Sequence, residues 1–122
     1  MARKERRKRE SAFQSEVIQE LEARWPGCKV RKNPPGYDNG FPDVVAYIGR
    51  LWAMFECKRS AHEKHRPNQD WWVDHLNLMG FARFIFPENK DTVLDELECY
   101  IRSNGTEVIP LTSFLDANEE GV

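Results

Sequence analysis

Two acids and a lysine lie at the ends of a predicted β-hairpin. The stretch GFPDVVAYIGRLWAMFECKRS, residues 40–60, contains two apolar runs separated by a glycine, a pattern typical of two strands and a turn. Asp43 opens the first run, and Glu56 and Lys58 close the second. An antiparallel hairpin brings these ends side by side. Because residues two apart on a strand share a face, Glu56 and Lys58 should continue an inward-facing apolar row.

Charged side chains in such a position favour a divalent cation. Two neighbouring carboxylates repel each other and are costly to desolvate, and Lys58 offsets only part of that cost. Mg²⁺ prefers oxygen ligands, commonly one or two carboxylates with water and substrate phosphates. Asp43, Glu56 and the backbone carbonyl of Cys57 could supply the protein ligands for Mg²⁺ or Mn²⁺. The alternative is a salt bridge between Lys58 and either acid. For Asp43, a further alternative is that Pro42-Asp43 only shapes a turn.

The elements that must position these residues follow from periodicity and turn signals. Apolar residues at helical spacing precede Pro26 and Gly27, and strand-like segments surround the hairpin. The predicted elements are a helix over 11–24, strands over 28–33, 43–48 and 51–58, a helix over 68–79, a strand over 81–86, a helix over 91–103 and a short strand over 107–109. This order predicts an α/β fold around a small mixed sheet.

The length of 122 residues suits one domain. Neither an internal repeat nor a Pro/Gly/Ser-rich linker divides the chain. We therefore expect a basic, flexible arm over residues 1–10, a single domain over 11–110 and an acidic tail over 111–122.

Cysteine usage and hydropathy indicate an intracellular protein. Cys28, Cys57 and Cys99 are odd in number and widely spaced, which argues against a disulfide framework and a cysteine-based zinc site. The apolar runs are too short to cross a bilayer, and no apolar signal-peptide segment follows the basic start. These features predict a reducing, cytoplasmic location and no association with a membrane.

The net charge of −2 conceals a basic amino-terminal segment. The first nine residues carry six Lys or Arg side chains against Glu5 alone. Such a run could hold nucleic-acid phosphates. It could equally be a disordered leader, or part of the first helix with a solvated charged face. The basic residues that would contact nucleic acid are Arg3, Lys4, Arg6, Arg7, Lys8, Arg9, Arg31, Lys32 and Arg59.

The hairpin residues resemble the signature of the PD-(D/E)xK nuclease superfamily. Pro42-Asp43 is followed, after twelve residues, by Glu56-Cys57-Lys58. The predicted element order also matches the superfamily's core. The resemblance implies a restriction-endonuclease-like α-β-β-β-α-β core, in which helices flank a central mixed sheet.

Two further segments resemble particular branches of this superfamily. RPNQDWWVDHLNLMG is similar to a segment of small VRR-NUC-type nucleases, which places Gln69 at the start of a helix near the metal site or a phosphate. Capping of that helix is the alternative role for Gln69. Glu16 resembles the first-helix glutamate that completes the metal site in Holliday-junction-resolvase-like proteins, although Glu10 and Glu20 compete for the role.

The resemblance implies a Mg²⁺-dependent DNA endonuclease that is structure-selective, for branched, junction or flap DNA, or weakly sequence-specific. The implied catalytic residues are Asp43, Glu56, Lys58, Glu16 and Gln69, and Glu16 would also contact the metal. Lys58 could orient water, help to deprotonate it or stabilise charge on the phosphate. Cutting two strands with one site per chain suggests a homodimer. The alternative is a nucleic-acid-binding protein that has this fold without catalysis.

Overall fold

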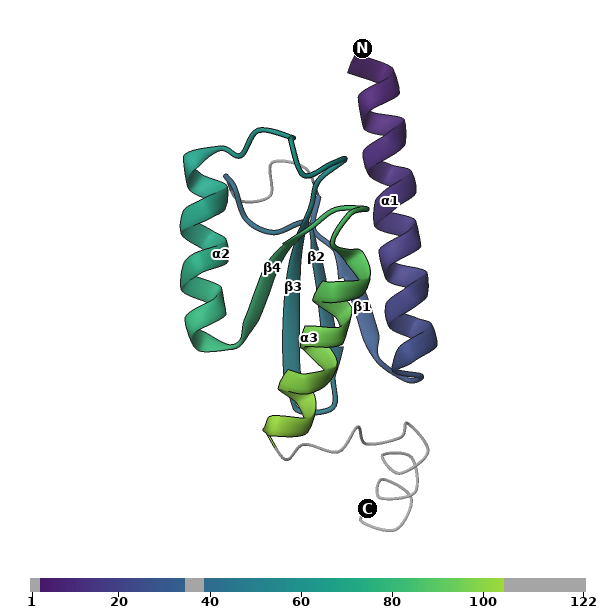
Figure 1. Ribbon diagram of the computed structural model, residues 1–122, viewed down its shortest axis with the longest axis vertical. Helices are drawn as coiled ribbons and strands as arrows, with labels where there is room; N and C mark the ends of the chain where they lie inside the picture. Colours follow the sequence, from purple (N-terminus) through teal and green to yellow (C-terminus); the bar gives the residue numbers. More distant parts are fainter. Residues whose placement is uncertain (1–2, 35–38, 105–122) are drawn as a thin grey trace.

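The computed structural model describes residues 3–34 and 39–104, except for the side chains of Arg6 and Arg7. Three helices and four strands make up this part of the chain (Figure 1). The elements are α1 (Arg3–Arg24), β1 (Lys29–Lys32), β2 (Val44–Ile48), β3 (Leu51–Cys57), α2 (Pro67–Met79), β4 (Phe81–Ile85) and α3 (Lys90–Ser103).

The four strands form one mixed sheet in the order β1-β2-β3-β4. The pairs β1–β2 and β2–β3 are antiparallel, whereas β3 and β4 run parallel. A tight turn joins β2 to β3, where Gly49 has a φ of 60°, a conformation that glycine adopts without a steric penalty. The hairpin predicted from the sequence is therefore confirmed.

Alternation along β3 divides its side chains between two apolar clusters. Ala53, Phe55 and Cys57 face the main core, which α1 and α3 cover. Trp52 and Met54 face a smaller cluster that α2 covers on the opposite side of the sheet. The sheet thus lies between two helical layers (Figure 1), and the predicted mixed sheet with flanking helices is confirmed.

Most predicted boundaries agree with the observed elements to within two residues, but the first helix is longer than predicted. Helix α1 begins at Arg3, so residues 3–10 continue the helix, as in the second interpretation of the basic segment. The apolar stripe that predicted this helix starts only at Phe13, because the described side chains of residues 3–9 are exposed to solvent. The predicted strand over 107–109 and tail over 111–122 lie outside the described residues.

None of the described helices is both long and apolar enough to span a bilayer.

Candidate functional site

The β2–β3 register places Asp43 beside Glu56. Val44 pairs with Phe55, so Asp43 and Glu56 occupy the next position along the hairpin. The Cys57 amide donates a hydrogen bond to Asp43 Oδ1 over 3.1 Å. The Asn33 amide donates to the Asp43 carbonyl over 2.8 Å. The backbones of Asn33, which follows β1, and of Cys57 in β3 therefore hold Asp43 at the open end of the hairpin.

Glu56 is a buried acid whose hydrogen bonding is incomplete. Its side chain lies on the α2 side of the sheet, and the residue is only 5% exposed. Oε1 accepts a hydrogen bond from Gln69 Nε2 over 3.0 Å, whereas buried Oε2 has no hydrogen-bond partner among the described residues. Burial, followed by repulsion from Asp43, raises the pKa of Glu56 to about 8. The site therefore resists a second negative charge unless a cation is present.

Lys58 continues the same row and is 3% exposed. Its Nζ donates to Gln69 Oε1 over 2.6 Å and to the Lys64 carbonyl over 3.4 Å. The carboxylate of Glu63 lies 3.5 Å from Nζ. Lys58 is thus held by the start of α2 and by the loop before it. Among the described residues, its ion-pair partner is Glu63, and not Asp43 or Glu56.

Gln69 connects the acid to the lysine. Its amide nitrogen donates to Glu56, and its amide oxygen accepts from Lys58. The same oxygen accepts the Arg66 amide hydrogen over 3.0 Å, so Gln69 also caps α2. The two roles weighed for this residue are combined in one side chain, which lies within the site.

Helix α1 contributes Gln14 and Glu10 to the site. Gln14 Nε2 donates to Asp43 Oδ2 over 2.9 Å. Burial raises the pKa of Asp43, although hydrogen bonds from Cys57 and Gln14 oppose the shift. Burial raises the pKa of Glu10 as well, and repulsion from Glu63 and Asp43 adds to the effect. Glu10 therefore lies within electrostatic reach of the hairpin acids.

The structure does not bring Glu16 into this cluster. Its carboxylate accepts a hydrogen bond from Lys90 Nζ over 2.7 Å, and its side chain is 58% exposed. Helical spacing explains the difference. Glu10 and Gln14 are seven and three residues before Val17, in the row that faces the sheet, whereas Glu16 lies on the face toward the start of α3. Extending the Val17–Leu21 row toward the amino terminus would have identified Glu10 and Gln14.

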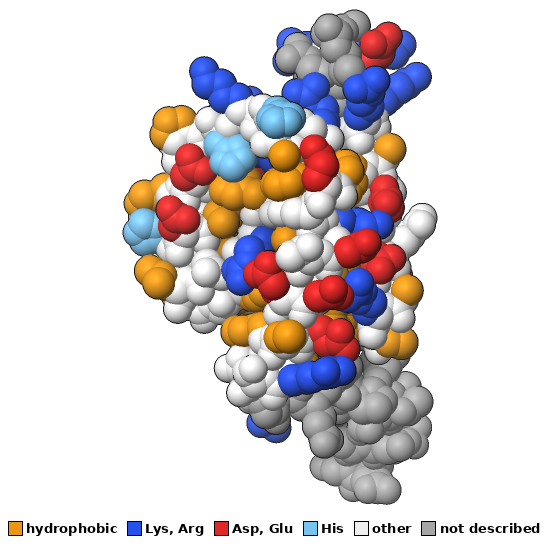
Figure 2. All heavy atoms as spheres, in the orientation of Figure 1, with side chains coloured by type: hydrophobic (Ala, Val, Ile, Leu, Met, Phe, Trp, Pro, Cys, Tyr) orange, Lys and Arg blue, Asp and Glu red, His pale blue; other side chains and the backbone are white. Residues whose placement is uncertain are grey.

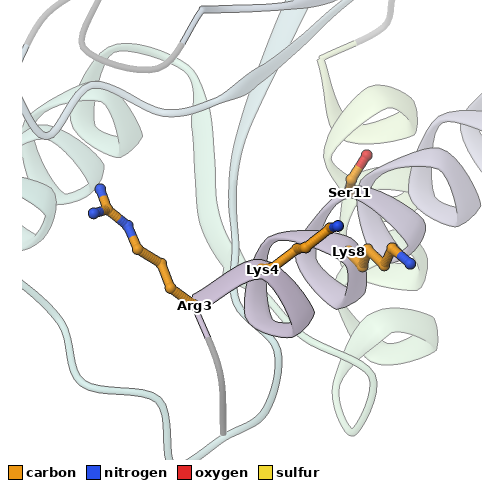
Figure 3. A pocket seen from close by; sticks show the side chains of 4 residues that line it. All are labelled: Arg3, Lys4, Lys8 and Ser11. Carbon is orange, nitrogen blue, oxygen red and sulfur yellow. The ribbon is translucent and has the colours of Figure 1, made fainter.

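The basic residues near the start of α1 lie at the same end of the molecule as the hairpin acids (Figure 1). Figure 2 shows Lys and Arg side chains gathered around this end of the helix. Arg3, Lys4, Lys8 and Ser11 line an open hollow of about 580 Å³, and the Arg3 side chain points away from the two lysines (Figure 3).

The other predicted nucleic-acid contacts are dispersed. Arg9, Arg31 and Lys32 are exposed. Arg59 is tied to Glu63, which accepts hydrogen bonds from the Arg59 amide over 2.9 Å and from Nε over 2.7 Å. Arg6 and Arg7 belong to α1, but their side chains lie outside the described part. Glu63 was not identified from the sequence, because a loop gives no periodicity from which side-chain direction can be inferred.

The residues at the hairpin edge fit a divalent cation. Asp43 and Glu56 supply carboxylate oxygens, and one of them is buried without a hydrogen-bond partner among the described residues. Burial and, after it, repulsion from Asp43 raise the pKa of Glu56, and a cation would relieve both. No three His, Cys, Asp or Glu side chains of the described residues are grouped for metal binding. A cation here would therefore need further oxygens from the backbone, water or a substrate phosphate, as Mg²⁺ commonly does.

Comparison with solved structures identifies a similar fold. A structure named "VRR_NUC domain protein" aligns with 76% of this chain and 88% of its own chain, with a TM-score of 0.56 and 18% sequence identity. The chain has a VRR-NUC-like fold. At this identity the likeness shows the fold alone. No protein-family model matches the chain, and no curated protein matches it in sequence.

Proposed function

We propose that this protein is a divalent-metal-dependent deoxyribonuclease that hydrolyses phosphodiester bonds. The observation that carries the proposal is the buried Glu56 carboxylate beside Asp43. Its Oε2 has no hydrogen-bond partner in the part of the chain that the structure describes, and Gln69 joins the carboxylate to Lys58. An apolar environment makes this arrangement costly for folding. A metal ion and a phosphate would satisfy the same groups. The VRR-NUC-like fold supports a nuclease, and the superfamily signature in the sequence supports the choice of residues.

In the proposed reaction, Asp43, Glu56 and the Cys57 carbonyl would hold Mg²⁺ or Mn²⁺. A bound divalent ion polarises the scissile phosphate and lowers the pKa of a bound water. Gln14 fixes the orientation of Asp43 through its hydrogen bond to Oδ2. Gln69 does the same for Glu56. Side chains held in this way lose little entropy when the substrate arrives.

Lys58 supplies the positive charge of the proposed site. Its ammonium group lies 2.6 Å from Gln69 Oε1, so it stays next to the acids without neutralising them directly. From there it could orient the attacking water, help to deprotonate it or stabilise charge on the phosphate. Glu10, rather than Glu16, is the α1 acid that we assign to this site, because its charge couples to those of Asp43 and Glu56.

The proposed substrate is DNA, held through its phosphates. Helix α1 continues for seven residues beyond Glu10 to Arg3, which is about 10 Å of helix. Arg3, Lys4 and Lys8 lie on this extension. Such contacts bind the backbone without selecting a sequence. We therefore propose structure-selective or weakly specific cutting, of junction, branched or flap DNA. One active site cuts one strand at a time, so a homodimer would supply the two sites that are needed to cut both strands.

A cleavage assay tests the proposal. Linear, branched and flapped DNA are incubated with the intact protein in Mg²⁺, in Mn²⁺ or in EDTA. We expect cleavage with either metal, none in EDTA, and a loss of at least about 100-fold in Asp43→Ala and Lys58→Ala. Both variants must bind DNA and unfold cooperatively for the comparison to be valid.

Failure of the intact protein to cut any of these substrates would contradict the enzyme. DNA binding without cleavage would instead support the alternative, a non-catalytic nucleic-acid-binding protein. Cleavage that both variants retain would place the active site elsewhere.

A further inference from the structure

The loop between β3 and α2 carries Glu63, which contacts both Lys58 and Arg59. Glu63 Oε1 accepts two hydrogen bonds from Arg59, through the backbone amide and Nε. Glu63 Oε2 lies 3.5 Å from Lys58 Nζ. The Glu63 side chain is only 15% exposed, so its contacts with the two cations are partly shielded from solvent.

These two contacts involve groups that a nucleic-acid phosphate would need. Lys58 already directs donors toward Gln69 and the Lys64 carbonyl, and Glu63 lies within ion-pair distance as the third polar neighbour. Arg59 is 27% exposed and is the more accessible of the two cations. A phosphate that approached Arg59 would therefore compete with the Glu63 carboxylate for the same guanidinium group.

The charge of Glu63 is well stabilised. Burial alone would favour the protonated acid, but the hydrogen bonds from Arg59 and the charges of Lys58 and Arg59 hold the pKa of Glu63 below its usual value. After burial, repulsion from Glu63 is the next largest cause that raises the pKa of Glu10. Glu63 thus keeps its negative charge beside Lys58 and Arg59.

We propose that Glu63 is an internal phosphate mimic, which occupies Lys58 and Arg59 in the free protein and yields them to a nucleic-acid phosphate. This inference rests on the proposed function, since it takes the site to receive DNA. A phosphate that takes Arg59 Nε, or the place next to Lys58 Nζ that Glu63 Oε2 occupies, must displace Glu63, so Glu63 lowers the affinity for DNA. It discriminates against weakly held phosphates that cannot offset the lost ion pairs.

Equilibrium binding of a fluorescein-labelled DNA duplex in EDTA tests the inference without cleavage. Glu63→Gln should bind about three- to tenfold more tightly than the wild type at low salt. Glu63→Asp keeps the charge and should show at most a twofold gain.

Glu88→Gln is the matched control. Glu88 accepts a hydrogen bond from the Ala61 amide over 3.0 Å, so it borders the same loop, and its recorded contact involves no cation. Its neutralisation removes one charge and should change the affinity by less than about twofold. In an Arg59→Ala background, the gain from Glu63→Gln should shrink, because one of the released cations is absent.

An Arg59 Nε–H resonance, followed by NMR in the wild type, gives a measurement that requires no variant. It should shift when the duplex is added, as its acceptor changes from a carboxylate to a phosphate. Affinity of Glu63→Gln equal to or below that of the wild type, or an equal gain in Glu88→Gln, would overturn the inference. An unchanged Arg59 signal on DNA binding would do the same.

These outcomes are separable from those of the cleavage assay. Metal-dependent cleavage together with no effect of Glu63→Gln would remove the role of Glu63 and leave the nuclease. Tighter DNA binding by Glu63→Gln without cleavage in any metal would keep the phosphate mimic and contradict the enzyme.

Discussion

Glu56 combines deep burial with a raised pKa, and the two have a common origin. The residue continues the inward row of β3, so its carboxyl group loses most of its hydration, and Asp43 adds repulsion. Gln69 donates to one oxygen, and the other has no hydrogen-bond partner among the described residues. Without a cation, folding therefore favours the protonated acid, and ionising Glu56 in the folded protein costs stability.

The stability of the metal-free protein should consequently depend on pH. An acid whose pKa rises from 4.5 in the unfolded chain to about 8 on folding binds its proton more tightly when folded. Its stabilising contribution is complete below pH 4.5 and is lost as the pH rises through 8. We expect the wild type to lose on the order of a few kcal/mol of unfolding free energy between pH 5 and 8 relative to Glu56→Gln. Urea denaturation in EDTA at several pH values measures the difference, and parallel pH curves would contradict it.

Glu10 and Glu16 give a direct comparison of two acids on one helix. Glu10→Gln should lower single-turnover DNA cleavage by about 10- to 100-fold, as expected for a residue that supports a metal site. Glu16→Gln should leave cleavage unchanged and lose less than about 1 kcal/mol of stability, because its ion pair with Lys90 is largely exposed. The reverse order of effects on cleavage would restore Glu16 to the site.

The hairpin residues could be predicted from the sequence because strand alternation has only two faces. Once Glu56 and Lys58 follow an apolar row, their direction is fixed. Side chains on a helix point in several directions around its axis. The choice between Glu16 and Glu10 therefore depended on which row of α1 faces the sheet. Glu63 lies in a loop, where only the folded chain determines what its carboxylate contacts.

The start of α2 is positioned by the loop that leads to Asp43. Gly40 has a φ of 82°, and a β-carbon there would lie 2.5 Å from Asn68 Cβ and 2.9 Å from the Gln69 amide nitrogen. Trp72 Nε1 donates to the Asn39 carbonyl over 3.2 Å, which ties the same loop to α2. This close approach holds Gln69 against Glu56 and Lys58.

Gly40→Ala should therefore affect both stability and the site. The positive φ and the close contact together should reduce the unfolding free energy by about 2–4 kcal/mol, and the displaced α2 should lower DNA cleavage. Gly49→Ala is the control, since Gly49 also has a positive φ but lies in the exposed hairpin turn. It should cost about 1 kcal/mol and leave cleavage intact. Thermal unfolding and cleavage rates measure both, and equal losses of activity would contradict the positioning role of Gly40.

Element order could be predicted because the apolar periods and the Pro and Gly signals are strong, as at Pro67 and Gly80. The extension of α1 to Arg3 could not be predicted in this way. Residues 3–9 provide no apolar stripe, and their helical state follows from continuation of a packed helix instead of from burial.

At the scale of the whole molecule, basic residues lie at both ends, but only one end carries the candidate site. The start of α1, with Arg3, Lys4 and Lys8, lies at the end that carries the candidate site. The start of β1, with Lys29, and the end of α3, with Arg102, lie at the opposite end (Figure 1). DNA bound at the site should therefore contact the first turns of α1 and leave the opposite end free.

Neutralising the basic end should weaken DNA binding. A triple Arg3, Lys4 and Lys8 to Gln variant should reduce the slope of log affinity against log salt by about two, because fewer counterions are released. The control is a triple Lys29, Arg50 and Arg102 to Gln variant, which makes the same charge change away from the site. Fluorescence anisotropy across a salt series measures both, and equal losses would show that only the net charge matters.

A calorimetric titration with Mn²⁺ at pH 8 measures whether Asp43 and Glu56 hold a divalent cation. The wild type and Glu16→Gln should bind Mn²⁺ alike, whereas Asp43→Asn and Glu56→Gln should each bind it about 10- to 100-fold more weakly. Absence of binding to the wild type, or equal affinity in Glu56→Gln, would contradict a metal site at the hairpin edge.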